Sequence, residues 1–176
     1  MGKPIGAPKR FRGVEQEQIE FAQFYRDRRD ACLRVVLAGV GDRQLAEDLV
    51  ADAFARAWAS WSKVGRHPAP HAWVVRTALN LKVSWWRRRR REVALDDHDL
   101  GETVDWPASD SPLMTALRRL PARQRQVVAL RVFLDLDTGT TAETLGIAPG
   151  TVKAHLSRAV AALRDELTLT HQQEIR

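Results

Sequence analysis

The sequence is poor in cysteine and in long apolar segments. Cys32 is the only cysteine among 176 residues, so an intramolecular disulfide is impossible and a cysteine-based zinc site would lack ligands. No apolar run approaches the roughly 18 to 20 residues of a membrane span. The basic segment 1–13 is not followed by the apolar core of a secretory signal. We therefore expect a cytoplasmic protein without membrane insertion.

Basic residues outnumber acidic residues in the chain. Lys and Arg number 28 against 22 Asp and Glu, which gives a formal charge of +6 and a sequence pI of about 10.2. This balance favours an anionic partner such as nucleic acid. With 44% hydrophobic residues, the length suits one domain or two small ones, and two compact helical modules fit it.

Acidic residues gather in one stretch between two basic parts. Residues 1–91 hold 19 basic and 9 acidic side chains, residues 112–176 hold 9 and 6, and segment 92–111 holds seven acids with no Lys or Arg. Low helical periodicity makes this segment typical of a linker. A solvated tether is the favoured interpretation. The alternative is a segment that lies in a positively charged channel of a partner.

The first module begins with two expected helices. An amphipathic pattern over residues 15–36 predicts a helix packed on one side, which Gly39 and Gly41 would end. Asp42 can then cap a second helix. Two adjacent rows of this helix should face the core, and they are Leu45, Leu49, Ala53, Ala57 and Trp61, and Val50, Phe54 and Trp58.

Three acids, Glu47, Asp48 and Asp52, follow the opposite side of this second helix. Carboxylates near a helix N-terminus interact well with the helix dipole, so stability and solubility are one explanation. A docking surface for a basic partner helix is the other, because the chain is otherwise cationic. The two explanations are compatible.

A third helix is expected over residues 71–91, after a loop at 62–70 that two prolines punctuate. Between Arg76 and Arg91 there are seven basic residues and no acid, with Trp85 and Trp86 directly before the arginine run 87–91. Guanidinium groups neutralise phosphates and indoles stack on exposed bases, which suits strand-separated nucleic acid. Alternatively, the tryptophans belong to the core and the arginines are a solvated cluster or localisation-like tract.

The second module should start at Pro112, capped by Ser111, and restart at Pro121. In the helix after Pro121, the first turn carries three polar residues that can hold phosphate, Arg123, Gln124 and Arg125. The expected core positions of the same helix are Val127, Val128, Leu130, Val132 and Phe133.

Residues 137–163 carry the strongest local pattern, a helix-turn-helix. Asp137 or Thr138 can cap the first helix, Gly146 can end it in the left-handed conformation, and Pro149 or Gly150 can open the second. The expected packing positions are Ala142, Leu145, Ile147, Val152, Leu156 and Val160. The positions left for a DNA groove are Thr151, Lys153, Ala154, His155, Ser157 and Arg158.

Three segments together resemble a bacterial protein family. They read AEDLVADAFARAWASW at 46–61, HAWVVRTALNLKVSWWRRRRR at 71–91, and LRRLPARQRQVVALRVFLD from 117, followed by TAETLGIAPGTVKAHLSRAVAALR from 141. Their order and spacing resemble the extracytoplasmic-function (ECF) sigma factors, the small promoter-recognition subunits of bacterial RNA polymerase, and the actinobacterial SigE-like group in particular. One departure is Gly139 to Thr141, where the family has a strongly helix-forming pair. A later or weaker helix start is expected there.

The resemblance implies an all-α fold of two small helical domains, a sigma region 2 bundle and a sigma region 4 helix-turn-helix, joined by a flexible acidic linker. The implied ranges are a disordered basic tail at 1–14, region 2 at 15–91, the linker at 92–111, region 4 at 112–170 and a C-terminal tail at 171–176. The linker corresponds to the connector that threads toward the RNA exit path.

The resemblance also implies three sets of site residues. Core-polymerase binding falls on Glu47, Asp48 and Asp52. Contacts to the minus-ten DNA fall on Lys63, Arg66, His67, Arg76, Asn80, Lys82, Trp85, Trp86, Arg87 and Arg88. Contacts to the minus-thirty-five DNA fall on Arg123, Gln124, Thr151, Lys153, Ala154, His155, Ser157 and Arg158. Asn80 matches the Asn of the family pattern R-x-A-x-N, and loop 62–70 matches the one that captures a flipped base.

The implied protein is not an enzyme and uses no metal or cofactor. Its partners are the RNA polymerase core, through the beta-prime clamp helices and the beta flap, and promoter DNA. An anti-sigma factor clamped between the modules is a further partner that the resemblance allows. Without polymerase we expect only weak, salt-sensitive DNA binding.

Two other classes share part of the pattern. A response-regulator-type transcription regulator shares LGIAPGTVKAHL, but this class leaves residues 46–91 unexplained and would bind duplex operators alone as a dimer. A nucleic-acid enzyme could use Asp96, Asp97 and His98, but these lie in an acidic stretch without a supporting shell.

Overall fold

The computed structural model describes residues 9–92 and 112–174, and this part of the chain folds into eight α-helices with no strand. The helices are α1 (Lys9–Val40), α2 (Arg43–Ala59), α3 (Trp61–Val64), α4 (Pro70–Glu92), α5 (Pro112–Arg119), α6 (Ala122–Phe133), α7 (Thr138–Leu145) and α8 (Pro149–Glu174). The expected all-α class is confirmed. Residues 93–111, which contain most of the acidic stretch, lie outside the described residues.

Helix α1 is longer at both ends than the sequence pattern predicts. It begins at Lys9 and passes through Gly39, so the expectation that Gly39 ends the helix is wrong. The helix stops at Gly41, whose φ of 83° is in the left-handed region that glycine adopts without strain. The amide of Gly41 donates to the carbonyl of Leu37 at 2.8 Å and closes the last turn.

Helices α1, α2 and α4 form the bundle of the first module. Asp42 caps α2 as expected, because its side chain accepts a hydrogen bond from the amide of Leu45 at 2.8 Å. The two predicted rows of α2 are buried or half-buried except for Trp58, which is 41% exposed. Trp58 lies at the end of α2 against Phe21, with 5.1 Å between ring centroids, and its other side faces solvent. Trp61 is buried as expected, although it belongs to α3.

Helices α5 to α8 form the second module around Val127 and Leu130 of α6, both fully buried. An ion pair between Arg119 and Glu166 adds a link between α5 and α8. The assignment of Val132 to the core is wrong, since this side chain is 66% exposed. It follows Leu130 by two positions and therefore lies roughly 200° around the helix from it.

The helix-turn-helix is formed as the sequence predicts, with two differences. Helix α7 starts at Thr138 without delay, so the expected late start is wrong. Asp137 explains this, because its carboxylate accepts from both the amide and the hydroxyl of Thr140, at 2.8 and 2.9 Å. In α8 the packing position is the fully buried Ala159, whereas the expected Val160 is 37% exposed.

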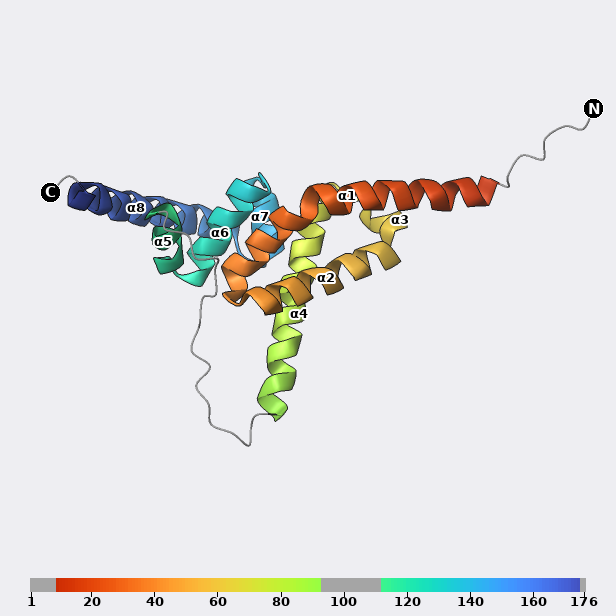
Figure 1. Cartoon of the computed structure of the whole chain (residues 1–176), viewed down its shortest axis with the longest axis horizontal. Coiled ribbons are helices and arrows are strands. Elements are labelled where there is room, and N and C mark those ends of the chain that lie inside the picture. Colours follow the sequence, from red (N-terminus) through yellow and green to blue (C-terminus); the bar gives the residue numbers. More distant parts are fainter. Residues whose placement is uncertain (1–8, 93–111, 175–176) are drawn as a thin grey trace, which may run out of the picture.

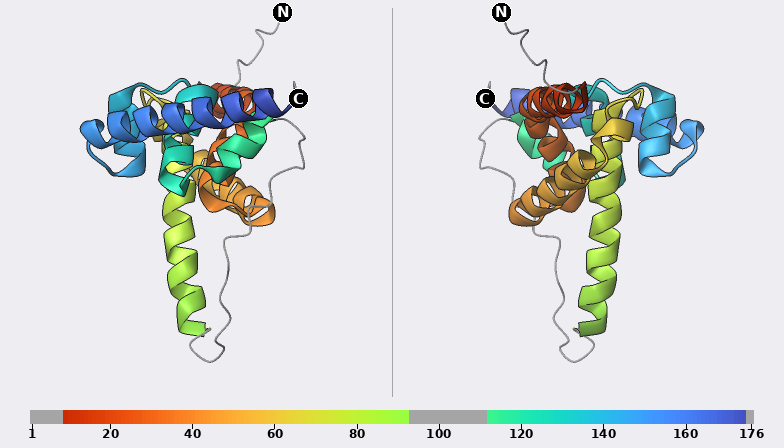
Figure 2. Two further views of the ribbon diagram at one scale, coloured as in Figure 1. Left: turned by 90° about the vertical axis from the view of Figure 1, so that its left-hand side faces the viewer. Right: turned by 90° about the vertical axis from the view of Figure 1, so that its right-hand side faces the viewer.

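The two modules pack against each other. Helix α6 lies along the C-terminal part of α1, and α7 lies against α4, so the buried residues of both modules form one continuous cluster. Figure 1 shows α1 and α8 extending in opposite directions from this junction. Helix α4 points away from it, as both views of Figure 2 also show.

Candidate polymerase and nucleic-acid interfaces

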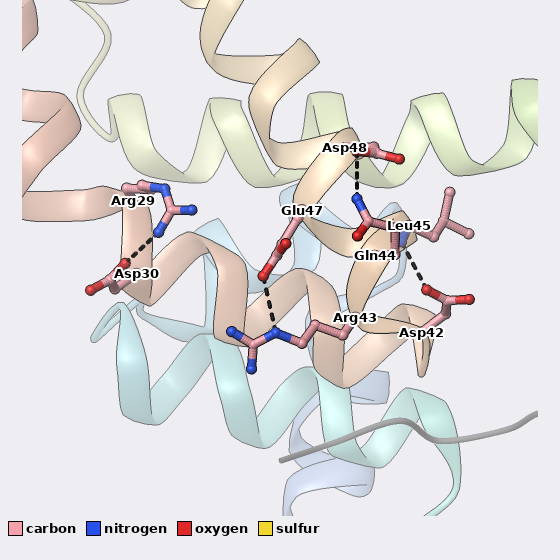
Figure 3. A network of polar contacts seen from close by, with 8 residues as sticks. All are labelled: Arg29, Asp30, Asp42, Arg43, Gln44, Leu45, Glu47 and Asp48. Atoms are coloured by element: carbon pink, nitrogen blue, oxygen red, sulfur yellow. Dashed lines mark hydrogen bonds and ion pairs between the residues drawn. The ribbon is translucent and has the colours of Figure 1, made fainter.

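The acidic face of α2, formed by Glu47, Asp48 and Asp52, is accessible. Asp48 and Asp52 are exposed and Glu47 is half-buried. Each carboxylate has a partner one turn away, and the pairs are Arg43 with Glu47 at 3.0 Å, Gln44 with Asp48 at 3.1 Å and Arg56 with Asp52 at 3.0 Å (Figure 3 shows the first two). Exposed i,i+4 ion pairs are worth only about 0.3–0.5 kcal/mol, so a basic partner can displace them at little cost. Asp48 accepts its hydrogen bond from the neutral amide of Gln44, which leaves the charge of this carboxylate available.

An aromatic cluster at one end of the first module positions the loop after α3. Trp61 stacks near Phe21 and Phe24, with ring centroids 5.1 and 5.0 Å apart, and Phe54 lies beside Phe24 at 5.6 Å. Sequence reasoning missed this cluster, although five Phe and six Trp residues in the chain could have suggested it. Trp61 is the first residue of α3, so its burial fixes where the loop leaves the bundle.

The end of α3 and the loop after it present Lys63, Arg66 and His67, all exposed. Nδ1 of His67 accepts a hydrogen bond from the amide of Ala69 at 3.0 Å, and the amide of His67 donates to the carbonyl of Val64 at 3.0 Å. These bonds hold the loop in a tight turn. The bond to Nδ1 fixes the orientation of the His67 ring against the loop backbone.

Helix α4 has one buried face and one polar face. Val74, Val75 and Ala78 are fully buried, whereas Arg76 and Asn80 are exposed. Lys82 is half-buried, and its ammonium group donates to the carbonyl of Gly39 at 2.8 Å. The α4 backbone continues to Glu92, but the side chains of Trp85, Trp86, Arg87 and Arg88 lie outside the described residues.

The second helix of the helix-turn-helix presents most of the predicted groove residues. Thr151, Lys153, Ser157 and Arg158 are exposed, while Ala154 and His155 are half-buried. The turn between α7 and α8 begins at Gly146, which has φ 64° and ψ 40°. The amide of Ile147 donates to the carbonyl of Ala142 at 3.0 Å and closes this turn. These two features match a left-handed helix C-cap.

In the first turn of α6, one of the three residues predicted to hold phosphate is buried. Arg123 is exposed and Gln124 is half-buried, so both remain accessible. Arg125 is only 3% exposed, and its guanidinium donates to the carbonyls of Ala38, Arg118 and Leu120. The assignment of Arg125 to phosphate binding is therefore wrong in this arrangement, because the side chain serves as an internal hydrogen-bond donor.

A cavity of about 380 Å³ lies where α4 meets α6 and α7. Arg76, Asn80 and Lys82 line it from α4, and Arg123 and Gln126 line it from α6. Residues from the predicted minus-ten and minus-thirty-five sets thus face one space. Among the residues that the structure describes, no cluster of His, Cys, Asp or Glu could hold a metal ion, and no helix is long and apolar enough to span a membrane.

Comparisons with known proteins decide the family. A family model described as Sigma-70 region 2 matches residues 21–92, and one described as Sigma-70, region 4 matches residues 111–163. The RNA polymerase sigma-E factor of Streptomyces antibioticus is 36% identical over 158 residues, 88% of each chain. The ECF RNA polymerase sigma factor SigL of Mycobacterium tuberculosis is 31% identical over 140 residues, 74% of this chain and 79% of that one. The chain is an ECF sigma factor.

Solved structures agree with this assignment of the sigma factor. The sigma factor RpoE of Bartonella quintana, crystallised with the anti-sigma factor NepR, is 28% identical, with a TM-score of 0.68 over 84% of this chain and 96% of that one. CnrH in complex with the cytosolic domain of CnrY shares the fold, with a TM-score of 0.56 at 21% identity.

The region 2 match covers α1 from residue 21 through α4, and the region 4 match covers α5 through α8 to residue 163, so the junction of the modules joins the two regions. The match to region 2 overturns the alternative of a response-regulator-type regulator, which left residues 46–91 unexplained. Sigma factors are non-catalytic transcription initiation factors.

Proposed function

We propose that this sigma factor binds core RNA polymerase through the acidic face of α2, holds the opened minus-ten element on α4 and the loop before it, and docks α8 on the minus-thirty-five element. The division of α4 carries this proposal. Its buried face anchors the helix in region 2, so Arg76 and Asn80 are held in place on the opposite side. Preorganised polar groups on a rigid element are what recognition of an unpaired strand needs.

Core binding is proposed for Asp48 first, with Glu47 and Asp52 beside it. The partner would be the beta-prime clamp helices, presenting basic side chains to the acidic face. Each of the three acids is paired only with an exposed side chain one turn away, in two ion pairs and one hydrogen bond from Gln44, so polymerase can replace these partners without unfolding α2. Region 4 would contact the beta flap.

Minus-ten recognition is proposed for the exposed side chains of the loop and α4. Lys63, Arg66 and His67 would surround a flipped base, and Asn80 would read the melted strand. The assignments of Lys82, Trp85, Trp86, Arg87 and Arg88 to the same element remain proposals. Lys82 would have to leave the Gly39 carbonyl to reach a phosphate.

Minus-thirty-five recognition is proposed for the exposed side of α8, with support from α6. Lys153 and Arg158 are exposed and fit phosphates or guanine edges, and Thr151 and Ser157 lie nearby on the same helix. Ala154 and His155 would make closer contacts, and Arg123 and Gln124 would hold the backbone.

The regions would act as two promoter-reading domains, 15–91 and 112–170, joined by the acidic linker 92–111 and flanked by the tails 1–14 and 171–176. Polymerase would carry out the phosphoryl transfer, so the sigma factor would need no cofactor and would act in the cytoplasm. An anti-sigma factor that clamps between the regions is a further partner we propose, since the matched RpoE was crystallised with one.

Run-off transcription on a genomic promoter library with purified bacterial core polymerase tests the proposal. Discrete starts should require the sigma factor. Asp48→Arg should lose core binding at least tenfold, whereas Asp165→Arg, an exposed acid in the C-terminal half of α8, is the matched control and should not. Asn80→Ala should keep core binding but melt less of the minus-ten element, as measured by permanganate reactivity.

The opposite pattern would refute the proposal. Absence of core binding and of new starts, together with tight binding of a dimer to duplex DNA alone, would assign the chain to ordinary duplex-binding regulators. Equal loss of core binding in Asp48→Arg and Asp165→Arg would remove the acidic face of α2 as the docking surface.

A further inference from the structure

The cavity between α4, α6 and α7 is lined by positive charge from two helices. Arg76 and Lys82 line it from α4, and Arg123 lines it from α6. Among the described residues, no Asp or Glu lines this cavity, and neither arginine has an ion pair. Like charges that share one space repel one another. A bound anion would therefore relieve this repulsion and gain a contact with each cation.

A nearly buried amide in the same cavity lacks an acceptor. Gln126 lines the cavity and is 7% exposed. Its Oε1 accepts a hydrogen bond from Nη1 of Arg123 at 3.3 Å, whereas its Nε2 lies against Gly39, only 2.0 Å from where a Cβ atom would be. Within residues 9–92 and 112–174, no hydrogen-bond acceptor meets this Nε2. A donor in this position needs an acceptor, and a phosphate oxygen would supply one.

The start of α6 adds backbone donors to the same cavity. Ala122 and Arg123 belong to the first turn of α6 and line the cavity, and no side chain caps this helix at Pro121. The amides of a first helical turn have no partner within the helix, and they favour anions. The C-terminal end of α7 also borders the cavity and opposes this effect, but a helix end carries only about half a charge. The three full charges of the side chains therefore dominate.

The cavity is larger than a phosphate group alone requires. Its volume of about 380 Å³ lies in the range of small-molecule sites, about 300–1,000 Å³. Leu79, Val83 and Leu145 give it an apolar part, and Val83 is 49% exposed. A planar ring would cover these side chains. The amides of Asn80 and Gln126 are suited to hydrogen bonds with the edge of a nucleobase.

We propose that this cavity is a binding site for a nucleoside diphosphate, with its phosphates among Arg76, Lys82 and Arg123 and its base against Leu79 and Val83. A monophosphate carries only about −1.5 to −2 charge at pH 7, so three cations match a diphosphate better. Magnesium bound to nucleotides is usually also held by one or two carboxylates, and none lines the cavity among the described residues. The site therefore takes the metal-free nucleotide, and it does so without DNA or polymerase.

Calorimetric titration of the full chain in EDTA tests the site. ADP, GDP, CDP and UDP are titrated in turn, and we expect at least one of them to bind with one molecule per chain. The corresponding nucleoside, which lacks phosphates, and inorganic pyrophosphate, which lacks a base, should each bind at least about tenfold more weakly. Absence of binding by all four diphosphates would overturn the site. Pyrophosphate that binds as tightly as the best diphosphate would overturn the assignment to a nucleotide.

The first variants are Arg76→Ala and Arg123→Ala, with Arg26→Ala as the matched control. All three arginines are exposed and helical, but Arg26 lies in α1 and does not line the cavity. Removal of one hydrogen-bonding charge should weaken nucleotide binding about tenfold in the first two variants and leave it unchanged in the control. An equal loss in Arg26→Ala would indicate general attraction to a basic protein and would overturn the site.

A second pair tests the apolar part of the cavity. Val83→Glu places a carboxylate where the base is proposed to lie, whereas Val132→Glu, at a 66% exposed position of α6, does not face the cavity. With far-UV circular dichroism showing both variants folded, binding should fall about tenfold in Val83→Glu and stay unchanged in Val132→Glu. Equal binding in both variants would overturn the placement of the base.

Hydrogen exchange locates the ligand independently of substitutions. Saturating nucleotide should slow exchange in peptides from the first half of α4 and from α6 and α7 together, and protection confined to other segments would overturn the site. A single-stranded dinucleotide of DNA that binds as tightly, with the same dependence on Arg76 and Arg123, would assign the cavity to a nucleic-acid strand instead and overturn the inference. Absence of polymerase-dependent starts would overturn the proposed function, while the nucleotide result would stand.

Discussion

A side chain at Gly146 should destabilise region 4, because of the backbone conformation alone. Its φ is 64°, and a Cβ atom added there would meet nothing within 4 Å, so Gly146→Ala introduces no clash. The left-handed conformation costs an L-residue about 1–2 kcal/mol, partly offset by roughly 0.4–1 kcal/mol from the stiffer unfolded chain. We therefore expect a net loss of roughly 1 kcal/mol in the unfolding free energy of region 4.

Gly150→Ala is the matched control. A Cβ atom on Gly150 also meets nothing within 4 Å, but Gly150 lies in the first turn of α8 and has no positive φ. Alanine there should stabilise the helix by about 0.5–1 kcal/mol. The two variants, which differ from each other only in position, should thus be separated by about 1.5–2 kcal/mol.

Native-state hydrogen exchange of the full chain provides the assay. The amide of Ile147, bonded to the carbonyl of Ala142 across the turn, reports the opening of the helix-turn-helix directly. A loss of 1 kcal/mol corresponds to about fivefold faster exchange, and a gain to the reverse. Equal protection of the Ile147 amide in the two alanine variants would refute the argument that the positive φ of residue 146 requires glycine there.

Three further predictions concern titratable groups. Burial raises the pKa of the Cys32 thiol to about 12, so the thiol should resist alkylation at pH 8 until region 2 unfolds, and fast labelling of the native chain would contradict this. Burial, and then the charges of Arg28 and His67, lower the pKa of His71 below its ordinary value of 6.5. The stability that the neutral imidazole contributes is therefore present above pH 6.5 and lost as the pH falls below it. In His71→Gln, the urea midpoint should fall less steeply below pH 6.5 than it does in the parent protein. Hydrogen bonds from Thr140 lower the pKa of Asp137 below 3.8, so its contribution is present above this pH and lost on acidification; a carboxyl titration by NMR that shows no downward shift would refute it.

Local patterns predicted the helix-turn-helix well because its signals are local. Asp137, Gly146 and Pro149 each act within one turn of the backbone, and each occupies its expected place. At Thr138 the cap that Asp137 provides outweighs the helix-weakening Gly139, so the helix starts earlier than the expectation drawn from Gly139 alone.

Long-range contacts account for the errors. Glycine indicates either positive φ or close approach of another element, and only the position of α6 reveals which one applies to Gly39. Arg125 is similar, because a basic residue in the first turn of a helix suits phosphate as well as it suits a distant carbonyl. Trp58 lies near the end of α2, where periodicity identifies the helix but not how far its neighbours extend. Val132 is a different case, because it lies on the side of α6 opposite to the buried Leu130.

Helix α4 is anchored at one end only. Val74, Val75 and Ala78 are fully buried, Ser84 is already exposed, and the backbone continues as a free-standing rod to Glu92 (Figure 2). In a continuous helix each residue turns the rest by about 100° and advances it by about 1.5 Å. One inserted residue after Ala78 would therefore rotate the whole arginine-rich end by about 100° about the helix axis without changing a single arginine. The rotational position of that end is fixed by the buried face of α4, to which Ala72, Val74, Val75 and Ala78 contribute.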